Sequence, residues 1–263
     1  MSARSVRKSV VSVEQDEGVG ARVRRSIGRR EVSYIIKGGV QHEDFCGNKG
    51  TLDDGDVQWM TAGRGIVHSE ILKKGITEHL QLWVNLAHKD KMIPPTYQDL
   101  KDKDIPRTKQ NGVLVKVIAG ESLGIKSSVF TRTPTMYLDF KLDKGAVLNQ
   151  PIPTEWNAFI YTLSGKVCIG KEDSAVEYEP HHTVVLEQNG DHVRVENMNS
   201  EVVHFLLIAG QPLKEPIKKH GPFVMTTDEE IEQAIADYRN GRNGFEKALT
   251  WQSKYMKKQK KKT

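Results

Sequence analysis

The stretch that decides the fold is Gly55–Glu70, which reads GDVQWMTAGRGIVHSE. A Gly-Asp turn opens it, an extended apolar segment follows, and two glycines flank Arg64 in a second turn. His68 and Glu70 stand two residues apart, so on a strand their side chains point to the same face. An imidazole nitrogen and a carboxylate oxygen aimed into one cavity can hold a divalent metal ion, iron in particular. On their own, a histidine and a glutamate at this spacing can equally be an exposed pair on the protein surface. The glycine spacing around them makes the motif specific.

Short extended segments dominate the chain. Each is bounded by Gly, Pro, Asn or Asp, and their spacing predicts a β-sandwich or β-barrel. An internal repeat indicates two such units, because Tyr34–Val40 and Tyr161–Val167 share a tyrosine, an aliphatic residue, a glycine and a valine. The predicted strands are residues 6–13, 19–27, 32–36, 40–45, 57–60, 80–86, 113–119, 127–131, 136–142, 158–163, 167–169, 183–186, 192–196 and 202–209.

Helical signals are few. Thr227 and the acidic residues after it cap the start of a helix, and a second short helix is predicted from Gly244 to about Tyr255. A helical turn is predicted near Tyr97–Leu100, inside a proline-bearing linker. The predicted domains are an N-terminal barrel at residues 1–106, a C-terminal barrel at 107–225, and helices with a basic tail at 226–263.

Composition indicates an intracellular globular protein. Of the 263 residues, 37% are hydrophobic and 28% are charged. No run approaches the roughly 18 apolar residues that span a bilayer, and the N-terminus lacks the apolar core of a signal peptide. Cys46 and Cys168 are too few for a disulfide framework, which fits a reducing compartment. We expect both to be small hydrophobic residues on strands.

The net charge of +5 is concentrated in two clusters, the arginines between Arg22 and Arg30 and the lysines between Lys257 and Lys262. The lysine tail can be a nuclear import signal or a contact for an acidic partner. A solvated end that only aids solubility is the alternative. Direct reading of nucleic acid is not expected, because no recognition helix or base-stacking platform is apparent.

Gly55–Glu70 and several other segments of the sequence match a known protein family. The sequence resembles the pirin family of the cupin superfamily, from about residue 9 to residue 254, and the Gly55–Glu70 motif is the most specific part. The other matching segments are Glu17–Gly28, His42–Gly47, Leu80–Leu86, Arg132–Thr135, Tyr137–Asp143, Glu179–Thr183 and His220–Met225.

The resemblance implies an all-β bicupin, with one mononuclear Fe(II)/Fe(III) site in the N-terminal barrel held by three histidines and a glutamate. His68 and Glu70 match the second pair of ligands, and Glu70 is the catalytic candidate. The family also implies a monomer of the nucleus and cytoplasm that co-regulates transcription with nuclear factor one and nuclear factor kappa-B assemblies. Some members have quercetin 2,3-dioxygenase activity, which makes a flavonol a possible substrate.

The first pair of ligands is absent. The family carries a His-Pro-His-Arg-Gly-Phe-Glu segment before the strand that begins here at Val32, and Arg24 and Ser26 stand at the two expected histidine positions. A skipped exon or an incomplete gene model accounts for the gap. Replacement by His42 or His79 is one possibility; half-exposed sheet positions for both are the alternative.

The C-terminal barrel is expected to be structural. At the positions equivalent to the missing pair it carries Pro151 and Pro153, which cannot bind metal. His181 and His182 are adjacent, so at most one can face the barrel interior, and we expect both to be hydrogen-bonded packing residues.

Three functions remain open at this point. The first is a co-regulator with an impaired iron site. The second is a quercetin 2,3-dioxygenase in which Glu70 serves as ligand and proton acceptor. The third is a metal-free, non-catalytic variant. Because a closed barrel that lacks a strand exposes an edge, we expect the N-terminal barrel to be destabilised and the C-terminal barrel to fold normally.

Overall fold

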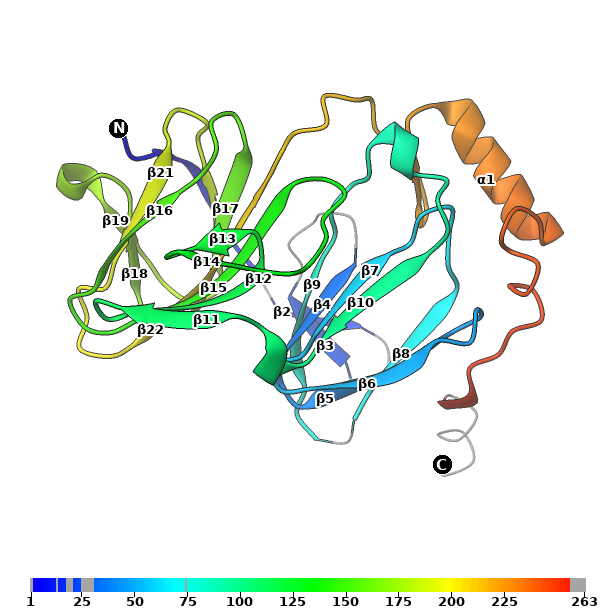
Figure 1. The fold of residues 1–263 in the computed structure, drawn as a ribbon, viewed down its shortest axis with the longest axis horizontal. Helices are drawn as coiled ribbons and strands as arrows, with labels where there is room; N and C mark the ends of the chain where they lie inside the picture. Colours follow the sequence, from blue (N-terminus) through cyan, green and yellow to red (C-terminus); the bar gives the residue numbers. More distant parts are fainter. Residues whose placement is uncertain (1, 13, 18–20, 25–30, 74, 256–263) are drawn as a thin grey trace. The chain divides into compact units, whose positions relative to one another are not determined.

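Figure 1 shows the computed structural model, which describes residues 2–12, 14–17, 21–24, 31–73 and 75–255. The chain forms two compact units, and each combines two separate segments. The first unit consists of Gly28–Asp104 and Leu213–Thr263, and the second of Met1–Ile27 and Ile105–Pro212. The change of unit at Ile105 lies beside the boundary predicted near residue 106. The segment up to Ile27 is grouped with the second unit, and the segment from Leu213 onward with the first.

The second unit contains two main antiparallel sheets. The seven-stranded sheet has the order β1 (Val6–Val11), β20 (His182–Leu186), β17 (Asn157–Ser164), β22 (Val203–Gly210), β15 (Thr135–Leu142), β12 (Val113–Ala119) and β11 (Arg107–Gln110). The four-stranded sheet has the order β16 (Val147–Pro151), β21 (His192–Glu196), β18 (Val167–Ile169) and β19 (Val176–Tyr178). The smaller elements are the hairpins β2 (Glu14–Glu17) with β3 (Ala21–Arg24) and β13 (Glu121–Ser122) with β14 (Ile125–Lys126), and the 3-10 turn η3 (Glu172–Ser174).

Alternating apolar residues of both sheets form the core of the second unit. Strand β12, for example, buries Val113, Val115 and Val117 on one face. The rings of Phe140 and Phe205 stack with their centroids 5.4 Å apart. A core of this kind follows directly from the period-two pattern of the sequence.

The start of the chain is held in the second unit by Arg4, whose side chain is fully buried. Its guanidinium donates to the carbonyl oxygens of Trp156 and Pro153, both at 2.7 Å, of Gly190 at 3.1 Å and of Glu187 at 3.4 Å. All four acceptors are backbone groups, so the five donors of the guanidinium serve as a crosslink between loops rather than as half of an ion pair. Burial lowers the pKa of Arg4.

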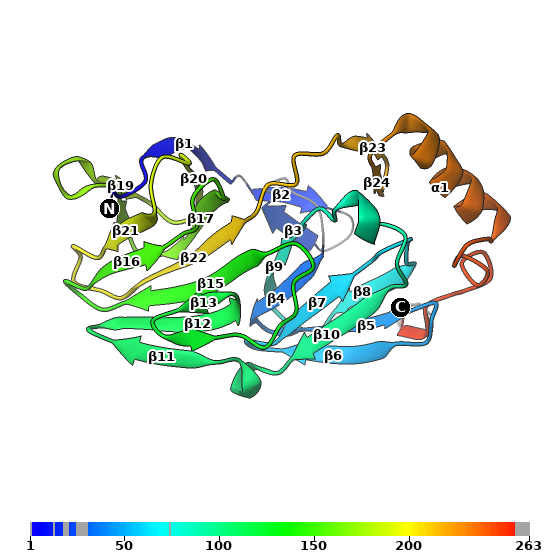
Figure 2. The same cartoon turned by 45° about the horizontal axis from the view of Figure 1, so that its top comes forward.

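The first unit is built from two smaller sheets. One has the order β10 (Thr96–Leu100), β7 (Val57–Thr61), β4 (Val32–Lys37) and β9 (Glu78–Leu82). The other has the order β6 (Lys49–Asp53), β5 (Gly39–Asp44) and β8 (His68–Leu72), which lie side by side in Figure 2. Two 3-10 turns, η1 (His88–Asp90) and η2 (Asp102–Asp104), connect the strands. Every residue of β7 is buried, and the strand lies between β10 and β4.

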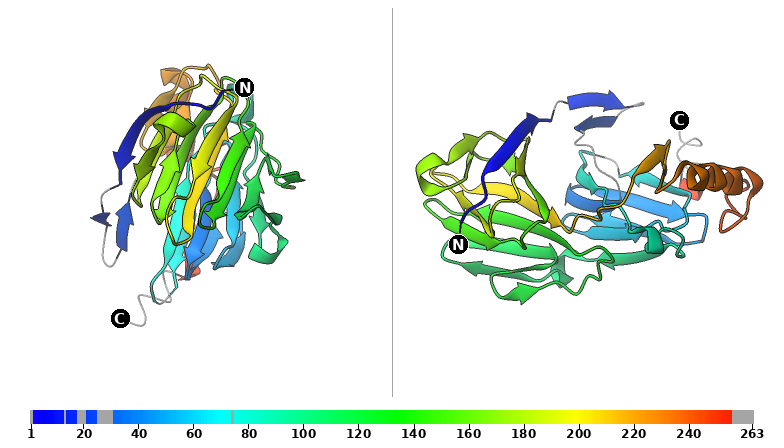
Figure 3. Two further views of the ribbon diagram at one scale, coloured as in Figure 1. Left: turned by 90° about the vertical axis from the view of Figure 1, so that its left-hand side faces the viewer. Right: turned by 90° about the horizontal axis from the view of Figure 1, so that it is seen from above.

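The C-terminal segment completes the first unit. It contains the hairpin β23 (Lys218–His220) and β24 (Phe223–Met225) and the helix α1 (Asp228–Asn240), which lie beside each other in Figure 3. After α1, Phe245 and Ala248 pack in one cluster with Phe45. The Glu43 carboxylate of β5 then accepts hydrogen bonds from the Ser253 hydroxyl at 2.5 Å and from the Tyr255 N–H at 2.8 Å.

Helix α1 begins with the predicted cap. The Thr227 hydroxyl accepts from the Glu230 N–H at 3.2 Å, and the Glu230 carboxylate accepts from the Thr227 N–H at 3.1 Å. Gly241 ends the helix with a left-handed backbone conformation. Among the residues that the structure describes, no helix is long and apolar enough to cross a membrane.

The cap gives an expected pH dependence. Hydrogen bonds from Thr226, strengthened by those from His88 and Thr227, lower the pKa of Glu230 to about 2. Because the folded-state pKa lies below the unfolded value of about 4.5, the carboxylate stabilises the fold fully above that value and loses this contribution as pH falls towards 2. Denaturant unfolding of Glu230→Gln should therefore show a deficit of about 1 kcal/mol at pH 6 that shrinks towards pH 2.

The matched control for this prediction is Glu229→Gln. Glu229 lies in the same first turn but is outside the capping box. A deficit for Glu230→Gln that stays constant from pH 6 to pH 2 would contradict the assignment.

Four structural expectations are corrected. Tyr97–Leu100 is not a helical turn but part of β10, whose residues pair with β7 from Thr61 to Val57. Residues 127–131 form no strand. Residues 246–250 form turns and residues 251–253 have no regular structure, rather than a helix, because the N–H groups of Ala248 and Thr250 bond three residues back, and Phe245 and Trp251 pack in the cluster with Phe45. Cys46 is exposed in a turn, whereas Cys168 is buried on β18 as predicted.

Candidate metal site

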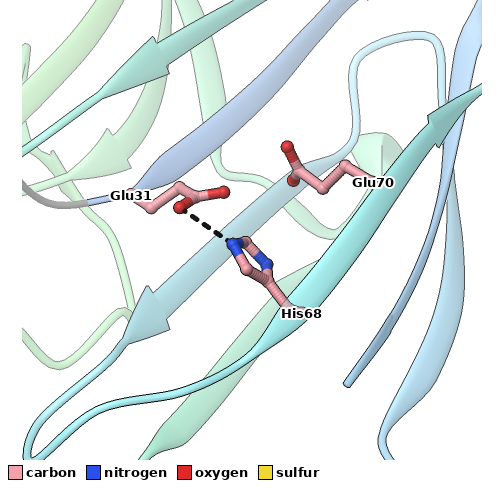
Figure 4. A group of neighbouring side chains, drawn as sticks. All are labelled: Glu31, His68 and Glu70. Atoms are coloured by element: carbon pink, nitrogen blue, oxygen red, sulfur yellow. Dashed lines mark ion pairs between the residues drawn. The ribbon is translucent and has the colours of Figure 1, made fainter. Parts of the chain in front are cut away.

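Three ionisable side chains meet in the first unit (Figure 4). His68 and Glu70 project from the same face of β8, and Glu31 approaches them from the residue before β4. His68 Nε2 lies 3.3 Å from Glu31 Oε2, and one potential ligand atom from each of the three residues lies within 4.8 Å of the others. All three are partly buried. The structure thus brings the two sequence-predicted residues together and adds a third.

The cluster joins the two sheets of the first unit. His68 and Glu70 belong to the three-stranded sheet, and β4, which begins one residue after Glu31, is central in the four-stranded sheet. The Ser33 hydroxyl of β4 donates to Glu70 Oε1 at 3.1 Å. Alternation along β4 places Glu31 and Ser33 on the same side of the strand, so both can reach β8.

A second row of polar groups supports the carboxylates. The amide nitrogen of Gln81 donates to Glu31 Oε1 at 2.9 Å and to Glu70 Oε2 at 3.2 Å. The amide oxygen of Gln81 accepts from Trp83 Nε1 at 3.0 Å. The shared Gln81 amide therefore gives both carboxylates a neutral donor in addition to the nearby His68.

The pKa values of His68 and Glu70 are both raised within the cluster. Burial, and then the negative charge of Glu31, raise the pKa of Glu70 to about 7. Burial on its own would lower the pKa of His68, but the hydrogen bond and charge of Glu31, together with Glu70, raise it. Without a cation the cluster therefore retains protons near neutral pH, and a divalent ion would take their place.

The chemistry of the donor set fits a divalent metal ion. One imidazole nitrogen and two carboxylates suit first-row ions such as Fe(II) or Mn(II). The described residues do not assemble three histidines and one glutamate, because only one histidine belongs to this group. The set is richer in oxygen donors than the one the sequence resemblance implies.

Sequence reasoning missed Glu31. A signal was present in the alternation Glu31, Ser33, Ile35, which puts these side chains on one face of β4. It could not be used without knowing that β4 lies opposite β8, since that placement depends on the packing of two sheets.

The other candidates in the first unit lie outside the group. His42 is buried, with 4% of its surface exposed, which corrects the expectation of a half-exposed position. It packs beside Gln58 and stacks on Tyr97, and burial lowers its pKa. His79 is partly buried as expected. Ser26 and the side chain of Arg24, the positions where histidines were expected, lie outside the described residues.

The histidines of the second unit take part in local contacts. The His182 ring bonds the Glu179 carbonyl oxygen at 2.9 Å, and the His181 N–H donates to the Thr162 carbonyl oxygen at 2.7 Å. His181 has a positive φ of 67° in the turn before β20, so the two are not successive residues of a regular strand.

Known structures share this architecture. A quercetin 2,3-dioxygenase from Acinetobacter baumannii is 33% identical, with a TM-score of 0.74 over 93% of this chain and 81% of that chain. GK1651 from Geobacillus kaustophilus is 27% identical, with a TM-score of 0.75 over 82% and 100% of the two chains. The fold and the cluster define a bicupin with a candidate metal site in one barrel, which confirms the predicted fold class. Sequence profiles described as "Pirin" and "Pirin C-terminal cupin domain" match residues 3–84 and 137–244. The chain belongs to the pirin family.

Full-length relatives with the same family name support this assignment. "Pirin" of Homo sapiens is 54% identical over 286 residues, covering 96% of this chain and 98% of the relative. "Pirin-like protein" of Solanum lycopersicum is 48% identical over 283 residues, covering 95% and 97%. The aligned region with the human relative is longer than the whole chain of 263 residues, so the relative contains residues that have no counterpart here. If a segment is missing before Val32, relatives that carry it must have residues without a counterpart in this chain.

Proposed function

We propose that this pirin-family chain is an iron-binding co-regulator of transcription, present in nucleus and cytoplasm, whose metal ion is held by Glu31, His68 and Glu70. The observation that carries the metal-binding part is the convergence of three ligand atoms within 4.8 Å. Support for iron comes from the family resemblance and from a donor set that suits Fe(II).

The proposed site is weaker than a four-ligand site. If a complete structural metal site provides roughly 10–16 kcal/mol, each of four ligands accounts for about 3–4 kcal/mol on average. The segment missing before Val32 removes two histidines of the family pattern, and Glu31 offsets part of that loss. The three protein ligands leave positions on the ion for water or substrate.

Iron content and affinity test the metal site. We expect about one iron per reconstituted chain. Each of His68→Ala and Glu31→Gln should weaken binding at least 100-fold, or about 3 kcal/mol, because each removes one donor. The measurement is anaerobic Fe(II) titration followed by metal analysis. The matched control is His220→Ala, an exposed histidine of β23 outside the cluster, which should bind as the parent does. Absence of iron would leave the metal-free variant as the function, whereas iron insensitive to His68→Ala would contradict the assignment of Glu31, His68 and Glu70 as its ligands.

The regulatory part rests on the resemblance and on the two basic clusters. We propose that the iron-loaded chain contacts assemblies of the nuclear factor one or nuclear factor kappa-B type through their protein surfaces. Binding of the parent chain to such a factor on its DNA site should exceed that of His68→Ala at equal protein concentration. Equal binding of both forms would remove iron from the regulatory role.

A quercetin 2,3-dioxygenase activity is the second candidate, and the similarity to the Acinetobacter baumannii enzyme favours it. Bound Fe(II) would supply the activation of flavonol and dioxygen. Glu70 can accept the proton of a flavonol hydroxyl, and Ser33 and Gln81 hold its carboxylate in place. Glu70→Gln should abolish quercetin turnover. Turnover at background level in the iron-loaded parent chain would exclude this activity.

A further inference from the structure

We propose that Gln81, oriented by Trp83, is the positioning residue that holds Glu31 and Glu70 together as a pair of metal ligands. This inference rests on the proposed metal-binding function and assigns roles to two residues outside the ligand set. Three features assign this role to Gln81: the register of β4 and β9, the polarity of its amide group, and the two negative charges that the amide contacts.

The register of β4 and β9 places two donors opposite each other. Ser33 pairs directly with Gln81, and opposed residues of an antiparallel pair project from the same face. Their donors reach different oxygens of one carboxylate: the Ser33 hydroxyl bonds Glu70 Oε1 and the Gln81 amide bonds Glu70 Oε2. Both oxygens of Glu70 are therefore fixed from the opposite sheet.

The same amide fixes Glu31. Its second N–H donates to Glu31 Oε1, which leaves Glu31 Oε2 as the oxygen directed at His68 Nε2. Gln81 thus determines which oxygen of Glu31 is presented to the ligand cluster. Glu31 and Glu70 are like charges side by side, and a neutral double donor holds them without adding a positive charge that would repel a metal ion.

Trp83 fixes the direction of the amide. An indole N–H can only donate, so the group opposite Trp83 Nε1 must be an acceptor, which is Gln81 Oε1. A reversed amide would set two N–H donors against each other at Trp83 and an oxygen against two carboxylates. The Trp83 contact therefore keeps the amide of Gln81 in the orientation that donates to both carboxylates.

Groups that orient metal ligands usually change affinity by 10–100-fold when removed. Gln81 is exposed, so its hydrogen bonds compete with water, and we expect the lower end of that range. Gln81→Leu should weaken the binding of Co(II), an optical probe of divalent sites, by about tenfold. Trp83→Phe keeps an aromatic ring and removes only the indole donor, so it should weaken binding by a smaller, measurable factor.

The experiment is a set of Co(II) titrations on the full chain, followed by absorption and calorimetry. Gln81→Leu is measured in the parent and in the Glu31→Gln background, and the metal-free thermal transition is recorded for each. If Gln81 acts through the carboxylates, its effect should shrink in the Glu31→Gln background while the metal-free transition stays unchanged. The matched control is Gln41→Leu on β5. Gln41 is adjacent to His42, so its side chain points to the face of β5 opposite to that of His42.

The outcomes separate the two proposals. A parent chain that binds no Co(II) in a His68-dependent way overturns both. A parent chain that binds Co(II), with Gln81→Leu binding equally tightly, overturns the positioning role alone. An equal loss with and without Glu31, or a lowered metal-free transition, would show that Gln81 acts on the fold instead.

Discussion

Gly63→Ala is expected to lower the free energy of unfolding of the first unit by about 2 to 5 kcal/mol. Gly63 has a φ of 54°, and a left-handed backbone costs alanine about 1–2 kcal/mol. An added Cβ would also lie 2.1 Å from the carbonyl oxygen of Ile93. That oxygen accepts the Arg64 N–H at 2.9 Å, so it cannot retreat without losing the bond. Overpacking of this kind costs about another 1–3 kcal/mol.

Urea unfolding monitored by tryptophan fluorescence measures this effect. The matched control is Gly221→Ala, in the same unit, where φ is 52° and nothing lies within 4 Å of the added Cβ. The control carries the backbone strain without the collision. Equal losses in the two variants would show that the contact with Ile93 is not the cause.

Arg4→Leu should destabilise the second unit by about 3 to 5 kcal/mol, because removing a buried guanidinium leaves its partners without donors. Four backbone carbonyls lose a donor at once, and each unsatisfied buried group costs about 1–3 kcal/mol. Part of this loss of stability is offset, because folding of the variant no longer requires the removal of water from a cation.

Equilibrium unfolding of the full chain is again the measurement. Arg7→Leu on the exposed part of β1 is the matched control and should change stability by less than about 0.5 kcal/mol. Arg4→Lys should fall between the two, since an ammonium keeps the charge but cannot reach all four carbonyls. Stability equal to that of the parent in Arg4→Leu would mean that these carbonyls find water or other donors instead.

Much of the first unit was predictable because its signals are local. The turns and the alternation in Gly55–Glu70 place His68 and Glu70 on one face of β8, and the repeat at Tyr34 and Tyr161 indicates two β units. The capping residues at Thr227 likewise determine where α1 begins. The alternation at His68 and Glu70 and the cap at Thr227 depend on residues only a few positions apart, and the repeat can be seen in the sequence without knowing which strands pair.

The unpredicted features depend on distant pairing. Glu31 reaches His68 only because β4 and β8 belong to two sheets that face each other, and no periodicity within either strand reveals this. The family pattern also predicts histidine ligands that the chain lacks. Tyr97–Leu100 was wrongly predicted as a helical turn, because its charged, proline-flanked sequence conceals a pairing with β7. The burial of His42 similarly depends on Gly50, where a Cβ would lie 2.4 Å from the His42 ring.

The division of the chain between the units has a consequence for biosynthesis. Glu31 and the strand that carries His68 and Glu70 leave the ribosome early, but Phe245 and Ser253, which pack on Phe45 and bond Glu43, are translated near the end. At about 5–20 residues per second, the barrel with the metal cluster waits roughly 10–30 seconds for the segment that completes it. Loading of the ion should therefore follow release of the finished chain, and a nascent chain arrested before Phe245 should not retain metal.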